Sequence, residues 1–254
     1  MKIKCHTAMR AVICLLVLCC LYSCGRDTSM EFETLNIDSK PCGSCPEVKI
    51  SIPEVKGRSK VARTVNNALT EEIISLLTFE DSLEVGTLNE AILSFRKGYE
   101  HIQQLYPDET PGWKAEIFAD ISYEDEQWLS IRLDTYTFTG GAHGYGAVRF
   151  LNFDKQKGTE IMSWQLFRNR DGFERLAEAR FREQEKIPEN KPINSTGFMF
   201  EEDRFYLPEN IGLGPEGVKL LYNQYEVASY ADGPIELVLP YSEVHQFLNY
   251  PGKS

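Results

Sequence analysis

The first half of the chain carries apolar side chains at the periods of both strands and helices. Residues 48–52 and 115–123 alternate between apolar and polar positions, which predicts two strands that each bury one face. Residues 61–76 and 88–105 carry apolar side chains three and four positions apart, which predicts two amphipathic helices. These four elements predict a first unit that mixes strands and helices.

The second half of the chain repeats this mixture. Alternation over 129–138 and 148–152 predicts further strands, and helical spacing over 173–181 predicts another helix. Near Asp134 the alternation changes phase, which a β-bulge at this position would explain.

Two segments show little periodicity. Residues 24–46 are polar and are predicted to form a linker, and the Pro- and Asn-rich residues 187–200 are predicted to form a mobile insertion. The fold class that follows is α+β, with two small lobes at residues 47–127 and 128–254. Each lobe is expected to be an antiparallel sheet with helices packed on one side.

The N-terminus has the order of a bacterial export signal. A basic start precedes the apolar run 11–21, which is too short to span a bilayer, since that takes about 20 residues. The sequence Leu-Tyr-Ser-Cys that ends at Cys24 looks like a lipobox. Residues 1–23 are therefore predicted to be a lipoprotein signal peptide. Cys24 would anchor the chain to the outer or inner membrane of a Gram-negative-type bacterium, unless the signal peptide is an ordinary cleaved one.

The formal net charge of −11 bounds the partners. Residues 1–23 carry three positive and no negative charges, so their removal would change the net charge to about −14. Such a chain is not expected to bind nucleic acid or to be recruited by anionic lipid head groups, but its field would steer cationic partners. The alternative is that the acidity only keeps an envelope protein soluble.

Five of the seven cysteines lie in the predicted signal peptide or at the proposed anchor, and Cys42 and Cys45 are the remaining two. Cys42 and Cys45 are spaced as Cys-Gly-Ser-Cys, and in an oxidising envelope a local disulfide between them is the expected state. A redox role would require a helix directly after the pair, whereas strand-like alternation follows. The same spacing is also compatible with half of a zinc site or with two unpaired thiols.

The chain contains few candidates for chemistry. It has no P-loop, no GxSxG and no second CxxC motif, so we expect neither a cofactor nor a metal site, and no enzymatic activity. His143 lies in a glycine-rich turn, where it either bonds to the backbone or serves a site with a carboxylate such as Asp120, Asp134 or Glu226.

Three tyrosines form a second candidate site. Tyr222, Tyr225 and Tyr230 lie in a short acidic segment, and rings of this kind offer contact area to sugars or to a basic protein. The alternative is that they pack in the hydrophobic core.

Two runs of sequence carry a family resemblance. The signature turn Thr139-Gly140-Gly141-Ala142-His143-Gly144 is the first, and the second extends from the Leu-Pro-Glu-Asn-Ile run at Leu207 to Pro240. Both resemble the RsiV/PdaC-like extracytoplasmic family. That family includes the sensor domain of a lysozyme-responsive anti-sigma factor and the non-catalytic region of a peptidoglycan deacetylase.

The resemblance implies a free-standing version of the sensor-like part, with a PdaC-like first lobe and an RsiV-like second lobe. It implies a non-enzymatic envelope lipoprotein that binds a cell-wall glycan or a cationic envelope protein such as lysozyme. A structural or assembly lipoprotein is the main competing interpretation. A cell-wall polysaccharide-modifying enzyme that uses His143 is a third.

Overall fold

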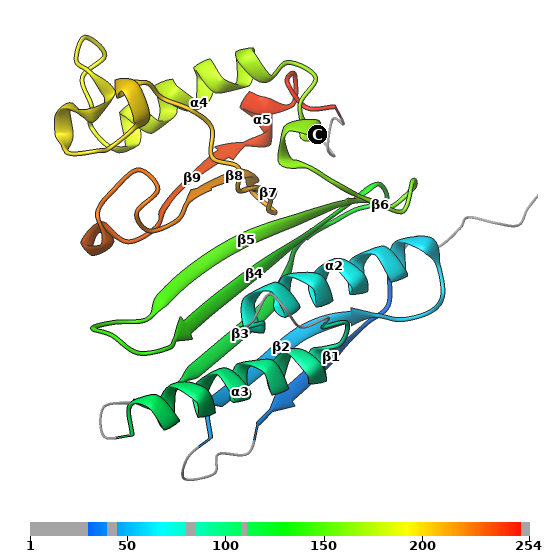
Figure 1. Ribbon diagram of the computed structural model, residues 1–254. Helices are drawn as coiled ribbons and strands as arrows, with labels where there is room; N and C mark the ends of the chain where they lie inside the picture. Colours follow the sequence, from blue (N-terminus) through cyan, green and yellow to red (C-terminus); the bar gives the residue numbers. More distant parts are fainter. Residues whose placement is uncertain (1–29, 40–44, 80–84, 108–110, 250–254) are drawn as a thin grey trace, which may run out of the picture. The chain divides into compact units, whose positions relative to one another are not determined.

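The protein is built around one large and one small β-sheet. The computed structural model describes residues 30–39, 45–79, 85–107 and 111–249. The large sheet has six strands in sequence order, and all neighbouring pairs are antiparallel except β2 and β3 (Figure 1). Its strands are β1 (Phe32–Asp38), β2 (Glu47–Val55), β3 (Lys114–Glu124), β4 (Trp128–Phe138), β5 (Tyr145–Asp154) and β6 (Thr159–Ile161).

Two long helices cover one face of this sheet. They are α2 (Lys60–Leu77) and α3 (Leu88–Leu105), which lie between β2 and β3 in the chain. Parallel neighbours need such a crossover connection, so this segment explains why β2 and β3 pair in parallel. Side chains such as Ile50, Ile117 and Ile131 are buried in this layer. The side chain of Thr87 caps α3 by accepting a hydrogen bond from the Glu90 amide.

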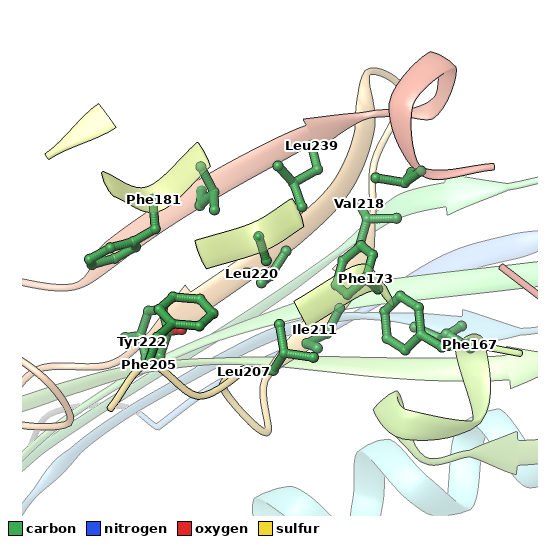
Figure 2. Packing of buried hydrophobic residues seen from close by; sticks show 14 of the residues in the cluster. Phe167, Phe173, Phe181, Phe205, Leu207, Ile211, Val218, Leu220, Tyr222 and Leu239 are labelled. Carbon is green, nitrogen blue, oxygen red and sulfur yellow. The ribbon is translucent and has the colours of Figure 1, made fainter. Parts of the chain in front are cut away.

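The small sheet has three antiparallel strands and its own helices. It consists of β7 (Ile211–Leu213), β8 (Gly217–Tyr222) and β9 (Ile235–Pro240). The helix α4 (Arg170–Gln184) packs on one of its faces, together with the short helix α5 (Tyr241–Val244). Figure 2 shows Phe173 and Phe181 of α4 in the same cluster as Leu220 and Tyr222 of β8, and all four side chains are buried. Short 3-10 helices lie at Ser163–Leu166, Ile193–Thr196, Glu201–Asp203 and Tyr230–Asp232.

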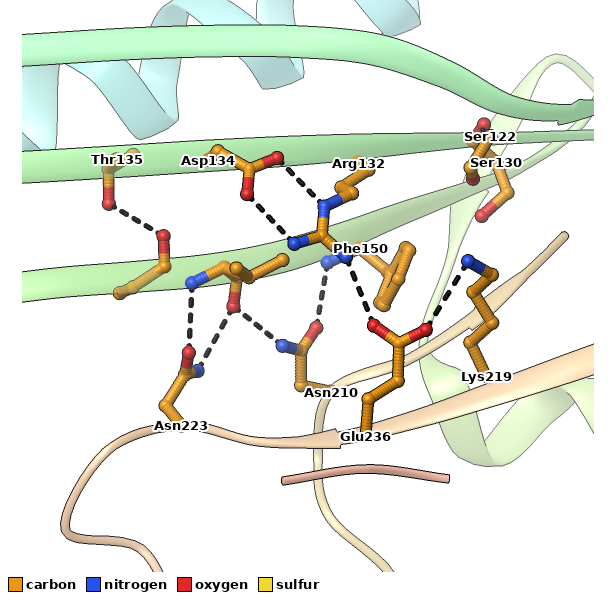
Figure 3. A network of polar contacts seen from close by, with 12 residues as sticks. Ser122, Ser130, Arg132, Asp134, Thr135, Phe150, Asn210, Lys219, Asn223 and Glu236 are labelled. Atoms are coloured by element: carbon orange, nitrogen blue, oxygen red, sulfur yellow. Dashed lines mark hydrogen bonds and ion pairs between the residues drawn. The ribbon is translucent and has the colours of Figure 1, made fainter. Parts of the chain in front are cut away.

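Side-chain amides join the small sheet to the large one. Asn210 and Asn223 flank β7 and β8, and each bonds the open edge of β5, where β6 does not pair (Figure 3). The Asn210 side chain accepts from the Phe150 amide at 2.7 Å and donates to the Val148 carbonyl at 2.6 Å. The Asn223 side chain accepts from the Val148 amide at 2.8 Å and donates to the Val148 carbonyl at 3.0 Å.

The large sheet satisfies the edge of β7 in the same way. Ser130 and Asn152 are buried polar residues on β4 and β5. The Asn152 side chain donates to the Ile211 carbonyl, and the Ser130 hydroxyl accepts from the Leu213 amide and donates to Asn152. Each sheet therefore supplies side-chain partners for backbone groups that would otherwise lack them.

An ion-pair chain lies beside these amides. Arg132 on β4 bonds Asp134 through two nitrogens and reaches Glu236 on β9 at 3.2 Å (Figure 3). Lys219 on β8 also contacts Glu236, at 3.3 Å. Trp128, Ser130 and Arg132 of β4 thus face the small sheet and its core, while Leu129, Ile131 and Leu133 are buried on the opposite face of the strand.

The predicted α+β class with two lobes is confirmed, and several details differ. The sequence predicted antiparallel sheets only, but β2 and β3 are parallel. The predicted boundary between residues 127 and 128 falls in the turn between β3 and β4, so the large sheet continues across it. The reason is that β4 and β5 bury one face under the first lobe and the other under the second.

Three local predictions were wrong. Residues 24–46 were expected to be a linker, but β1 lies within them, because Leu35 and Ile37 are enough to form a half-buried edge strand beside β2. The bulge lies at Ser122 in β3 rather than near Asp134. Residues 187–200 are not simply a mobile insertion, because Ile187, Ile193 and Phe200 are core side chains.

We expect Asn210→Ala to destabilise the protein. The change leaves the amide of Phe150 without its partner, which should cost about 2 kcal/mol and lower the melting temperature by roughly 4–8 °C. Thermal unfolding followed by circular dichroism would measure this. The matched control is Asn36→Ala, because Asn36 is exposed and its side chain accepts a hydrogen bond from the Ser51 hydroxyl within one sheet. Equal melting temperatures for both variants would show that the amide does not hold the sheets together.

Candidate ligand-binding site

The signature turn joins β4 to β5 at one end of the large sheet. Gly140 and Gly141 have φ angles of 108° and 89°, a left-handed backbone conformation that favours glycine. Gly144 is restricted differently. A Cβ at this position would lie 2.4 Å from the Tyr136 ring and 2.7 Å from the Thr137 carbonyl oxygen. The turn therefore brings its backbone directly against a tyrosine ring.

The loop between β8 and β9 meets this turn. The Tyr230 ring stacks on His143 with ring centroids 4.2 Å apart and an interplanar angle of 24°. Its hydroxyl donates to the Gly144 carbonyl at 3.4 Å. Tyr225 follows on, with its ring centroid 5.5 Å from that of Tyr230. The rings of His143, Tyr230 and Tyr225 thus form a row. We call these three residues and Tyr136 the tip cluster.

The loop is held by its own polar contacts. The amide of Asn223, whose side chain bonds β5, donates to the Glu226 carboxylate at 2.9 Å. Burial raises the pKa of Glu226, and this bond to the Asn223 amide opposes the shift. Ser229 bonds Asp232 through its amide and its hydroxyl, which caps the turn that carries Tyr230. Tyr225 has a φ of 68°, a backbone conformation that is uncommon for residues with a Cβ.

The tip cluster offers ring surface to solvent. Tyr225 is 56% exposed and Tyr136 is 37% exposed. His143 is exposed as well. Rings held in place by backbone and by each other lose little conformational entropy on binding, so such a row suits the flat faces of sugar rings.

The structure places the predicted site residues differently. It brings His143 of the signature turn together with Tyr225 and Tyr230, although 82 residues or more separate them in the chain. Thr139 and Ala142 are exposed in the turn. Tyr222 was predicted as a ligand-binding residue, and that is wrong. It is fully buried under α4 and donates its hydroxyl to the Tyr206 carbonyl, because it closes β8 on the core face.

Two cysteine predictions fall partly or wholly outside the described residues. Cys45 is disulfide-bonded, and Cys42, its predicted partner, is not among the residues that the structure describes. Cys24 also lies outside them.

His143 does not meet the predicted carboxylates. Its Nδ1 lies 3.1 Å from the Gly144 carbonyl, so this bond requires a proton on Nδ1. Asp134 is paired with Arg132, and Glu226 is bonded by Asn223. In the part of the chain that the structure describes, no group of three or more His, Cys, Asp or Glu side chains suits a metal ion. Its helices include none that is long and apolar enough to cross a membrane.

Sequence reasoning missed Tyr136. Its ring lies against Gly144. The carbonyl oxygen of Gly144 accepts hydrogen bonds from His143 Nδ1 and from the Tyr230 hydroxyl. The signal in the sequence was an aromatic residue out of phase with the buried side chains of its strand, which we attributed to a bulge.

A surface hollow of about 340 Å³ lies elsewhere, on strands β1 to β3 near Phe32, Pro53 and Phe118. Of the sequence-predicted site residues, Asp120 lines it, whereas His143 and the tyrosines do not. We therefore base the site on the tip cluster, where the predicted residues meet.

Comparisons with known proteins agree with this architecture. Residues 43–145 match a family model described as Deacetylase PdaC, and residues 165–242 match one described as Protein of unknown function (DUF3298). No curated protein matches the chain.

Two crystal structures show the same fold. A DUF3298 family member from Bacteroides fragilis superimposes with a TM-score of 0.68 at 17% identity, covering 88% of this chain and 95% of the other. A DUF3298 family protein from Pseudomonas aeruginosa gives a TM-score of 0.62 at 21% identity, covering 88% and 96%. At these identities the likeness establishes the fold alone.

The fold and the two matches define a two-lobed α+β protein with a PdaC-like and a DUF3298 region. The chain belongs to the RsiV/PdaC-like family, as its signature turn predicted.

We expect Gly141→Ala to destabilise the signature turn. Its φ of 89° is strained for alanine, although nothing lies within 4 Å of the added Cβ, so the cost comes from backbone alone. That cost should be about 1–2 kcal/mol. The matched control is Gly112→Ala, where a Cβ also meets nothing within 4 Å and the φ is not left-handed. Unfolding in denaturant would compare the two variants, and an unchanged midpoint for Gly141→Ala would contradict the explanation of the signature.

Proposed function

We propose that this protein is an exported, lipid-anchored binding module of the bacterial envelope and that it binds a cell-wall glycan at the tip cluster. The observation that carries the proposal is the row of Tyr225, half-buried Tyr230 and His143, in which Tyr225 and His143 are exposed. Ring faces of this kind pack against the C–H faces of sugars, and their polar edges accept or donate hydrogen bonds.

A binding role fits the contacts of His143 better than a catalytic one. A catalytic histidine needs an orienting partner and a nucleophile or water to act on. Here the Nδ1 atom bonds backbone and the ring face stacks on Tyr230, so the contacts hold the ring in place as a surface. The deacetylase activity in the name of the matched model belongs to that protein, and our proposal does not require it here.

The binding proposal predicts the effect of Tyr225→Asn. Asparagine tolerates a positive φ, so this change removes the ring and leaves the loop backbone suited to its conformation. Affinity for soluble peptidoglycan fragments should fall about three- to tenfold, the range for one aromatic contact. Isothermal titration calorimetry would measure it.

The matched control is Tyr106→Ala. Tyr106 is 57% exposed, against 56% for Tyr225, but it ends α3 and is not part of the tip cluster. Equal affinities of Tyr225→Asn and the control would rule out the tip cluster as the glycan site. No binding by the unmodified chain would rule out the ligand.

A cationic protein such as lysozyme is a second candidate ligand. Three consecutive acidic residues, Glu201–Asp203, are exposed, and the formal net charge is −11. Charges of this kind steer a basic partner to the surface.

If lysozyme binds, its association rate should fall steeply with added salt. At physiological ionic strength the Debye length is only about 8 Å, so a decrease of roughly tenfold or more is expected relative to low salt. Surface binding assays with lysozyme would measure the rate. An association rate that does not change with salt concentration would contradict electrostatic steering. Absence of binding at low salt would rule out lysozyme as a ligand.

A further inference from the structure

Cations gather at the end of the large sheet opposite the tip cluster. The Lys60 ammonium donates to the Lys157 carbonyl at 2.9 Å, and the Thr64 hydroxyl donates to the Gly158 carbonyl at 2.9 Å. These bonds join the start of α2 to the turn between β5 and β6. We call the exposed cations there the basic end; they are Lys56, Arg58, Lys60, Arg63 and Lys157.

Much of this positive charge is not neutralised. Residues 56–63 contain four cations and no acid, in a chain of net charge −11. Lys56 pairs with Glu33 and Glu54, and Lys157 pairs with the buried Asp154. Among residues that the structure describes, Arg58, Lys60 and Arg63 form no ion pair with a carboxylate, and the hydrogen bonds of the Lys60 and Arg63 side chains go to backbone carbonyls.

The chain enters the folded unit at the same end. The Lys56 amide donates to the Glu31 carbonyl at 2.8 Å, so Glu31 lies beside the basic end. Glu31 follows Cys24 by seven positions, and a chain of that length spans at most about 25 Å. An acyl group on Cys24 would therefore keep the basic end within reach of the bilayer surface.

We propose that the basic end docks on the anionic phospholipid head groups of the membrane that holds Cys24. This rests on the lipid anchor of the proposed function. A lipid chain and a basic surface are two signals that together give stable membrane association. The ten residues of β5 separate the basic end from the signature turn, a distance of about 30 Å, so docking would hold the tip cluster away from the membrane.

The net charge does not contradict docking. An acidic chain is not expected to be drawn to anionic lipids as a whole, but net charge averages over all surfaces. A bilayer contacts one end only, and charges beyond a Debye length of that contact are largely screened.

Vesicle co-sedimentation tests the proposal without the anchor. The mature chain, residues 24–254 with Cys24→Ser, would be mixed at low salt with vesicles of phosphatidylcholine, with or without phosphatidylglycerol. Each cation near an anionic surface strengthens binding roughly fivefold, so the triple variant Arg58→Gln, Lys60→Gln, Arg63→Gln should bind phosphatidylglycerol vesicles about a hundredfold more weakly.

The control triple variant is Arg96→Gln, Lys97→Gln, Arg175→Gln, which changes the net charge equally at exposed positions on α3 and α4. It should bind nearly as well as the unaltered chain, as should a charge-keeping Arg58→Lys, Arg63→Lys variant. Melting temperatures would confirm that all variants fold.

Three outcomes would overturn the proposal: no binding to phosphatidylglycerol vesicles, equal binding to neutral vesicles, or equal weakening by the two triple variants.

The proposed lipid anchor and glycan site are tested by other measurements. Unchanged membrane association of Cys24→Ala in cells would remove the anchor, and unchanged glycan affinity of Tyr225→Asn would remove the tip cluster, whereas Tyr225→Asn should leave vesicle binding unaltered.

Discussion

The exchange of side-chain hydrogen bonds between the two sheets is the interaction on which the rest of this structure depends. A three-stranded sheet and the open edge of β5 both present backbone groups that need partners. Asn210 and Asn223 supply those partners for β5, and Ser130 and Asn152 supply them for β7. Because hydrogen bonds require specific geometry, this exchange sets where the small sheet lies on the large one.

The candidate site inherits its geometry from this exchange. Asn223 is the residue directly after β8, so the bond that holds β5 also fixes the start of the loop that carries Tyr225 and Tyr230. The same strand, β5, begins at the signature turn. The bonds between Ser229 and Asp232, and the Tyr230 hydroxyl bond to the Gly144 carbonyl, then hold Tyr230 over His143. Gly144 in the signature allows the turn to lie against the Tyr136 ring.

Much of the fold could be predicted from the sequence because it depends on local pattern. The spacing in α2 and α3, the Thr87 cap and the glycines of the turn are all signals within a few residues. Other features depend on contacts between distant segments. Leu35 and Ile37 form a strand only because β2 lies beside them, and Tyr222 differs from Tyr225 only because β8 ends between them.

The sequence indicated most residues of the candidate site but not which of them are in contact. His143, Tyr225 and Tyr230 were each recognisable as candidates, yet no spacing in the sequence indicates that the first and last of them stack. Tyr136 was missed because its phase was read as a bulge, whereas it lies on the face of β4 that meets the small sheet. The basic end was not predicted, because the net charge of the chain does not show where its cations lie on the surface.

The central claim is that the signature turn and the β8–β9 loop form one binding surface. Backbone amide chemical shifts recorded by NMR during titration with soluble peptidoglycan fragments test it most directly. The account predicts that residues 139–145 and 225–233 shift together, with the same concentration dependence, while residues 56–63 do not. Shifts confined to one of the two segments, or centred on the hollow near Phe118, would contradict it.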